Sequence, residues 1–222
     1  MFFIHLSCNM MMKHSLFILF LTVATAVLAQ NPASQDHSLE TMASWEHTQA
    51  KGDLNKDGID DLVIIATPPF KMKEEDGEEY TQPILAIYWG NSDGSFSLFR
   101  HYDNVMPVIY GDNIQLEWSV NITPHGVLNI GVSSFASTGS WESWRETNVL
   151  RYQEGDFFLI GKEQSSLSRN TGKTVDTSTN YLTRKCHTTT GNEFDQSVTP
   201  RTVWSRLPKA GLKRLGTWRL GE

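Results

Sequence analysis

Residues 53–65 read DLNKDGIDDLVII and place an oxygen-bearing side chain at every second position before an apolar run. A calcium ion takes roughly six to eight oxygen ligands, and a short acidic loop supplies most of them. We therefore predict a calcium site in this loop. Its side-chain ligands would be Asp53, Asn55, Asp57 and Asp61, and the backbone carbonyl of Ile59 would fill the step between the last two.

This loop has two alternative interpretations. A solvated acidic turn has a similar composition, because Asp, Asn and Gly favour turns for backbone reasons alone. An EF-hand needs a bidentate Glu at its twelfth position and a helix on each side. Counting from Asp53, the twelfth residue is Ile64, inside the apolar run 62–66 that is typical of a buried strand. The loop therefore leads into a strand, and Gly58 would permit the turn within it.

The following residues complete a recognisable unit. Residues 83–89 (PILAIYW) predict a second apolar strand, which ends in the turn GNSDGS at 90–95 and is followed by FSLF at 96–99. The segment Gly52 to Phe99 resembles one FG-GAP/VCBS-type repeat, the unit of integrin-like β-propellers. In that family a calcium loop leads into a strand, and a second strand ends in a Gly-Asn-x-Asp-Gly-x-Phe turn. The linker at 68–79 is longer and more acidic than is usual there.

A complete propeller is excluded, because propellers typically need four to eight blades and no second Asp-x-Asn-x-Asp-Gly occurs. Downstream, the pattern predicts hairpins of 115–122 with 127–130, 145–153 with 156–162, and 171–176 with 180–185. Residues 38–49 fit a short helix, and 45–50 also fit a strand that enters the loop. We expect an all-β fold of antiparallel hairpins or a meander, in a small sandwich or partial-propeller-like domain with the calcium loop leading into a strand.

The chain also resembles a group of secreted bacterial proteins of unknown role. The elements that carry this resemblance are Gly139-Ser140, the strand pair 150–152 with 157–161, and the stretch 180–183, Asn-Tyr-Leu-Thr. The resemblance implies export and leaves the activity open.

The first 29 residues predict a signal peptide. Lys13 and His14 precede an apolar core at 16–27, and cleavage is expected after Ala29. The core is shorter than the ~20 apolar residues of a transmembrane helix, so no membrane span is expected after cleavage. Residues 30–222 would form one domain, periplasmic or secreted. The true start is left open among four residues, Met1, Met10, Met11 and Met12.

Composition limits the partners. The formal net charge of −6 argues against nucleic acid, which is bound through clustered Lys and Arg. The basic stretch at 201–219 is interpreted as a terminal segment with solvent-exposed charges. After cleavage Cys186 is the only thiol, so no internal disulfide is expected. Cys186 and His187 are adjacent and would point to opposite faces of a strand, which does not suit a catalytic pair.

The function that these patterns favour is binding. No Gly-x-Ser-x-Gly elbow, His-Glu-x-x-His or phosphate-binding Gly-rich loop is present. Trp141 and Trp144, near the Gly/Ser-rich loop 133–143, are a candidate ligand surface. We expect a binding or envelope-associated module with a structural calcium and an unknown protein or glycan ligand. The alternative is a secreted hydrolase of glycan or cell-wall substrates that uses Glu142 and Glu146 as its carboxylate pair.

Overall fold

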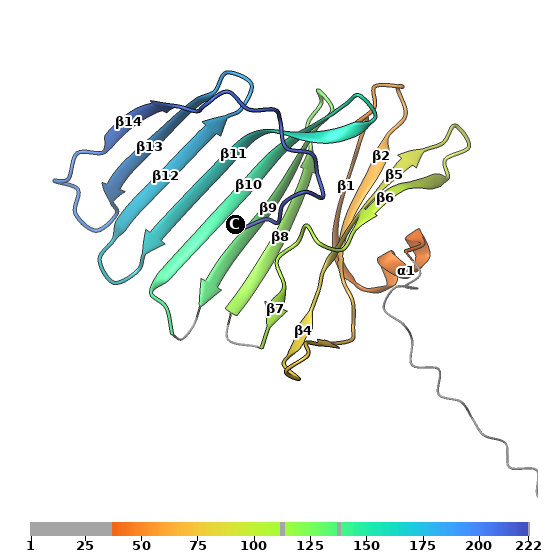
Figure 1. The fold of residues 1–222 in the computed structure, drawn as a ribbon, viewed down its shortest axis with the longest axis horizontal. Helices are drawn as coiled ribbons and strands as arrows, with labels where there is room; N and C mark the ends of the chain where they lie inside the picture. Colours follow the sequence, from red (N-terminus) through yellow and green to blue (C-terminus); the bar gives the residue numbers. More distant parts are fainter. Residues whose placement is uncertain (1–36, 112–113, 137–138, 222) are drawn as a thin grey trace, which may run out of the picture. The chain divides into compact units, whose positions relative to one another are not determined.

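A computed structural model describes residues 37–111, 114–136 and 139–221 (Figure 1). The predicted signal peptide lies outside these residues. The described chain contains one short helix followed by strands, whose bounds are α1 (Leu39–Ser44), β1 (Glu46–Gly52), β2 (Asp61–Thr67), β3 (Met72–Lys73), β4 (Glu79–Thr81), β5 (Ile84–Gly90), β6 (Phe96–Tyr102), β7 (Ile109–Tyr110), β8 (Ile114–Ile122), β9 (Val127–Ala136), β10 (Glu142–Gln153), β11 (Asp156–Ser168), β12 (Lys173–Asn180), β13 (Lys185–Asn192) and β14 (Arg201–Arg206).

The strands form three antiparallel sheets. A four-stranded sheet has the order β1-β2-β5-β6, and a seven-stranded sheet has the order β14-β13-β12-β11-β10-β9-β8 (Figure 1). A small sheet, β3-β4-β7, is formed partly by the linker between β2 and β5. The seven-stranded sheet is a meander, in which each strand pairs with its neighbour in sequence. This confirms the expected all-β class, with a two-sheet sandwich as its architecture.

The two central strands of the four-stranded sheet, β2 and β5, are buried on both faces. Alternate residues of β2 and β5, including Val63, Ile65 and Leu85, face a core shared with the seven-stranded sheet. The intervening residues, including Ile64 and Tyr88, face a second cluster with the helix α1. This explains why β2 is a continuous apolar run instead of an alternating one.

The seven-stranded sheet contributes alternating side chains to the shared core. Leu128 and Ile130 from β9, Leu150 from β10 and Phe157 from β11 are fully buried there. The residues between them point to the opposite side, which carries polar side chains; we call it the polar face. The sandwich covers only part of this sheet, because the strands β12 to β14 contribute no residue to the shared core cluster.

The segment after β14 returns across the core side of the sheet (Figure 1). Leu215 donates its backbone N–H to the Phe157 carbonyl at 2.8 Å, and Leu220 donates to the Val105 carbonyl at 2.8 Å. Both leucine side chains are buried in the shared core. The last described residues therefore complete the core that the first strands began.

Two local expectations need refinement. Residues 39–52 contain both elements that were considered, the helix α1 and then the strand β1. The third hairpin was predicted with the wrong turn, since β12 extends through 177–180 and the turn comprises residues 181–184. Arg184 adopts a positive φ of 57° at this turn. In the part of the chain that is described, no helix is long and apolar enough to cross a membrane.

Candidate functional site

The predicted calcium loop is organised by its own acidic side chains. Asp53 Oδ1 accepts the backbone N–H of Lys56 at 2.6 Å, and Asp53 Oδ2 accepts that of Gly58 at 3.0 Å. Asp57 Oδ1 accepts the N–H of Ile59 at 2.8 Å. Gly58 has φ of 88°, which a residue with a side chain rarely adopts, so the glycine is needed for this turn.

Asp61 has a different position from the other predicted ligands. It is fully buried, and its Oδ2 accepts the N–H of Leu54 at 2.8 Å while its Oδ1 accepts the N–H of Gly90 at 3.0 Å. Burial raises the pKa of the Asp61 carboxyl, because desolvation outweighs the backbone amides that favour the carboxylate. Asp61 thus connects the start of the loop to the end of β5.

The loop carries oxygen atoms of the kind that bind a hard cation, but its carboxylates do not converge on one point. Within residues 37–111, 114–136 and 139–221 no group of three or more His, Cys, Asp or Glu side chains is arranged to hold a metal ion. Carboxylate and carbonyl oxygens have a second lone pair, so accepted hydrogen bonds leave some capacity for a ligand. The predicted ligands are therefore unchanged, and the calcium site remains a prediction. They are the carboxylates of Asp53, Asp57 and Asp61, the Asn55 amide oxygen and the Ile59 carbonyl.

Trp141 and Trp144 do not form one aromatic surface. Trp144 lies in β10 and packs against the shared core. Trp141 is 63% exposed, and its neighbour is the Arg169 guanidinium, whose Cζ lies 5.9 Å from the indole and 4.3 Å from the centroid of the Phe135 ring. The exposed aromatic group at this end of the sheet is therefore Phe135 with Trp141.

Glu142 and Glu146 are not arranged as a catalytic pair. Glu146 is 1% exposed and forms an ion pair with Lys162 at 2.9 Å. Its carboxylate also accepts hydrogen bonds from Asn148 Nδ2 at 2.7 Å and from the backbone N–H of Gly221 at 3.2 Å. Glu142 is exposed and is the first residue of the same strand, β10. The buried Glu146 carboxylate is used to hold the terminal segment on the sheet.

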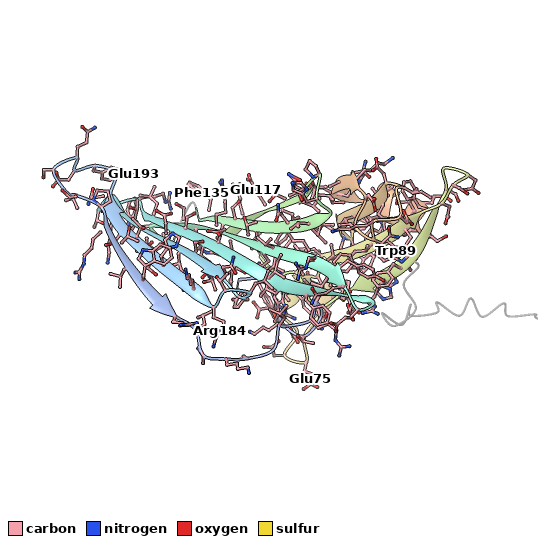
Figure 2. All side chains as sticks on the ribbon, turned by 90° about the horizontal axis from the view of Figure 1, so that it is seen from above. Glu75, Trp89, Glu117, Phe135, Arg184 and Glu193 are labelled. Atoms are coloured by element: carbon pink, nitrogen blue, oxygen red, sulfur yellow. The ribbon has the colours of Figure 1, made fainter. Side chains whose placement is uncertain are left out.

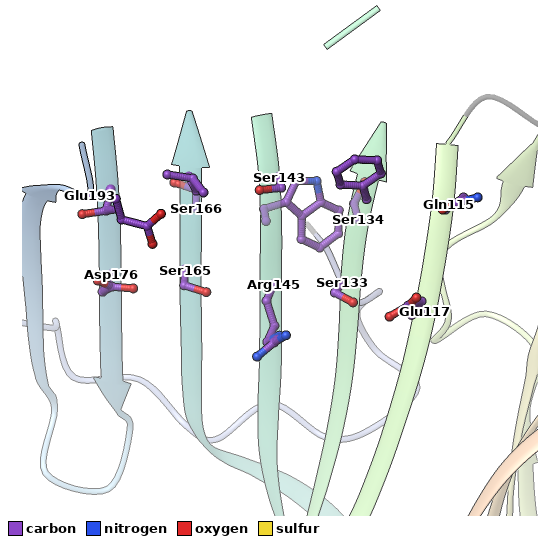
Figure 3. A pocket seen from close by; sticks show the side chains of 14 residues that line it. Gln115, Glu117, Ser133, Ser134, Ser143, Arg145, Ser165, Ser166, Asp176 and Glu193 are labelled. Atoms are coloured by element: carbon purple, nitrogen blue, oxygen red, sulfur yellow. The ribbon is translucent and has the colours of Figure 1, made fainter. Parts of the chain in front are cut away.

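The polar face carries a row of aligned side chains that sequence analysis did not identify. Neighbouring strands place Glu117 opposite Ser133, Ser133 opposite Arg145, Arg145 opposite Ser165, and Ser165 opposite Asp176. Figure 3 shows these five side chains in order across β8 to β12. We call them the charged row, and it consists of Glu117, Ser133, Arg145, Ser165 and Asp176.

A groove of about 570 Å³ lies over the charged row. Phe135 and Glu193 also line it, and a smaller hollow of about 230 Å³ continues from Arg145 and Asp176 toward His187. Figure 2 shows Glu117, Phe135 and Glu193 on one side of the seven-stranded sheet and Arg184 on the other. The groove is thus on the side away from the terminal segment.

The charges in the groove are not neutralised by one another. Arg145 is exposed, and it makes no ion pair or hydrogen bond to any described residue. Strands in a sheet are ~4.8 Å apart, so Arg145 lies roughly 10 Å from both Glu117 and Asp176 along the row. With Glu193 nearby, the groove carries more negative than positive charge. Its groups are therefore free to interact with a ligand.

The sequence contains a signal for this surface. Polar residues alternate with residues that pack in the core in β8 and β9, as in Glu117-Trp118-Ser119 and Val132-Ser133. Such alternation is also expected for any solvated sheet face. The strand register brings the charged residues into one row. Only this register distinguishes a ligand-binding surface from an ordinary solvated sheet face.

Comparison with known proteins found no matching family model, no matching curated protein and no matching solved structure. The resemblance of residues 52–99 to an FG-GAP/VCBS-type repeat therefore remains a prediction from the sequence.

Proposed function

We propose that this chain is an exported, non-catalytic binding domain whose ligand occupies the groove on the polar face. The observation that carries the proposal is Arg145, which has no ion-pair or hydrogen-bond partner among the described residues and lies at the centre of a groove that also presents Glu117 and Asp176. Charged side chains on neighbouring strands have fixed positions, and strands hold a binding site more rigidly than loops do.

The burial of Glu146 and the distance between Glu117 and Asp176 favour a binding function over hydrolysis. The alternative hydrolase requires two carboxyl groups about 5–9.5 Å apart across a substrate cleft. Glu146 is buried against Lys162, Asn148 and Gly221, so it is not accessible to a substrate. Glu117 and Asp176 lie four strands apart in the sheet order, which is roughly 19 Å at the usual strand spacing. That separation is too great for the two-carboxylate mechanism.

The calcium loop has a structural role in this proposal. It lies between β1 and β2, and Gly126, in the turn between β8 and β9, closely approaches the Asp53 carbonyl, so that a Cβ atom there would lie 2.6 Å from this oxygen. An ion bound to the folded loop alone would stabilise the folded chain by mass action. The ion would stabilise the contact between the two sheets and would not contact the ligand.

The test is a binding screen on matched arginine variants. We would measure saturation-transfer NMR with a panel of neutral oligosaccharides, acidic oligosaccharides and short peptides. Arg145→Ala should weaken the binding of the panel's ligand at least tenfold. Arg201→Ala is the control, because Arg201 is an exposed arginine of β14 in the same sheet. The register continues from Asp176 through Thr189 to Thr202, so Thr202 lies on the polar face. The side chain of the adjacent Arg201 therefore lies on the opposite face. Equal loss in both variants, or no binding by any panel member, would refute the proposal.

A further inference from the structure

We infer that the ligand of this groove is an uncharged glycan chain that lies across the strands, along the charged row. The inference rests on the proposed function, since it names the ligand class of the same site. It is carried by the spacing of the row, by the hydrogen-bonding groups within it, and by the exposed aromatic rings beside it.

The spacing of the row suits a chain of sugar rings. Each of the strands β8 to β12 contributes one side chain, at the strand separation of ~4.8 Å. This separation is close to the length of one pyranose unit in an extended glycan. A chain that crosses the strands would therefore present one sugar to each member of the row.

The side chains in the row match the chemistry of sugar hydroxyls. The carboxylates of Glu117 and Asp176 accept hydrogen bonds, and the Arg145 guanidinium donates them. Ser133 and Ser165 do both. A hydroxyl group is a donor and an acceptor, so it can pair with every group in this alternating row. Carboxylates and guanidinium groups also bind two adjacent hydroxyls in a bidentate manner, as planar groups do.

Exposed aromatic rings lie at both ends of the polar face. Phe135 is 45% exposed and Trp141 63% exposed, and the Arg169 guanidinium over the Phe135 ring supports both. At the opposite edge Trp204 is 65% exposed, with its ring 4.6 Å from that of His187. The apolar C–H face of a pyranose packs on such rings, which supply apolar contact area beside a polar surface.

Other ligand classes fit the groove less well. An extended peptide binds a sheet at a free edge, where it gains backbone hydrogen bonds. Strands β9 to β13 are paired on both sides, so a peptide over the row would leave its own backbone groups unpaired. Nucleic acids and acidic glycans would be repelled by the carboxylates of Glu117, Asp176 and Glu193. An apolar ligand would desolvate these charges without compensation.

The experiment is affinity electrophoresis in gels that contain soluble neutral polysaccharides, namely β-glucan, xylan and mannan. A gel with polygalacturonate provides the acidic comparison. We expect retardation by at least one neutral polysaccharide and none by polygalacturonate. Calorimetry with oligosaccharides of increasing length should show affinity rising up to about five units, the number of strands that the row crosses, and then levelling off.

Variants locate the binding on the row and on the aromatic rings. Arg145→Ala and Trp141→Ala should each reduce affinity at least tenfold. Arg201→Ala and Phe70→Ala are matched controls, because Arg201 lies on the opposite face and Phe70 is an exposed aromatic residue that contacts Trp45 away from the groove. Both controls should bind normally.

The outcomes separate the inference from the proposed function. Tighter binding of polygalacturonate, or affinity independent of chain length, would overturn the glycan inference. A short peptide that binds in an Arg145-dependent manner would overturn it as well, while the proposed binding groove would stand. If neither glycans nor peptides depend on Arg145, the inference and the proposed function both fail.

Discussion

The carboxylate of Asp61 accepts a hydrogen bond from the backbone N–H of Gly90 at 3.0 Å, across 29 residues of sequence. The same carboxylate accepts the N–H of Leu54 at 2.8 Å. One buried side chain therefore joins the predicted calcium loop, the start of β2 and the end of β5. This contact fixes the loop to the four-stranded sheet whether or not an ion is bound.

Asp61→Ala should destabilise the protein by about 3 kcal/mol, because each buried N–H that is left without an acceptor costs about 1–3 kcal/mol. Asp60→Ala is the matched control, since the adjacent Asp60 is exposed. Urea unfolding followed by tryptophan fluorescence measures both. If the two variants unfold at the same midpoint, the connection through Asp61 contributes nothing to stability.

Calcium should raise the melting temperature, and chelation should lower it. At a free calcium concentration of 100 Kd, the expected stabilisation is about 2.7 kcal/mol. Asp57→Ala should abolish the response to calcium. Asp93→Ala should retain it, because Asp93 makes a similar turn contact to the Ser95 N–H outside the loop. Superimposable thermal curves of the unmodified protein with calcium and with chelator would rule out the calcium site.

Replacement of the buried Glu146 should lower the free energy of unfolding far more than replacement of Glu142. Glu146→Gln removes the carboxylate from the Glu146–Lys162 ion pair, and breaking a buried ion pair from one side costs about 3–5 kcal/mol. Glu142→Gln, on the same strand, should have little effect. The double variant Glu146→Gln with Lys162→Met should recover part of the loss, as measured by a double-mutant cycle. Additive losses would mean that the two groups do not interact.

Tyr102 should make stability fall in alkaline solution. Burial raises the pKa of the Tyr102 hydroxyl to about 12, despite the nearby Arg100 guanidinium. The folded pKa is above the unfolded value of about 10, so the folded state retains a proton that the unfolded state releases. This contribution is complete below pH 10 and is lost as the pH rises to about 12, in total up to about 3 kcal/mol.

Tyr102→Phe removes this titration. The Tyr102 hydroxyl makes no hydrogen bond within the described residues, so the substitution itself should cost little at pH 7. Denaturant unfolding at pH 8 and pH 11 would compare the variant with the unmodified protein. The unmodified protein should lose more stability over this interval, and equal losses would show that Tyr102 titrates normally.

Strands in which apolar and polar residues alternate were predictable from the sequence. The residues with which each strand pairs or packs were not. Residues 115–122 alternate apolar and polar side chains, and the structure places β8 there. The turn between β12 and β13 was misplaced, because Thr177 and Ser178 resemble turn residues while Tyr181 and Leu182 resemble strand residues. In the structure Thr177 pairs with Thr188 in the sheet, and the Tyr181 N–H donates to the Ile160 carbonyl outside it. Such long-range pairing overrides local preference.

The candidate sites also differ in whether their residues are close together in the sequence. Local motifs identified the 53–61 loop, because its residues are consecutive in sequence. The charged row joins side chains from five strands, between residues 117 and 176, and it exists only through the register of the whole sheet. Glu146 was a candidate catalytic carboxylate in the hydrolase interpretation, because its partners Lys162 and Gly221 are distant in sequence and its burial could not be predicted.

The return of residues 207–221 across the sheet has a consequence for the order of folding. Leu215 and Leu220 fill the same core as Leu54 and Val63, so that core cannot close while synthesis is still in progress at β14. Contacts that join such distant residues form slowly, since the loop between them must close first. A chain made only as far as β14 would therefore lack two of the leucines of this core, and residues 207–221 should be among the last to gain their native contacts.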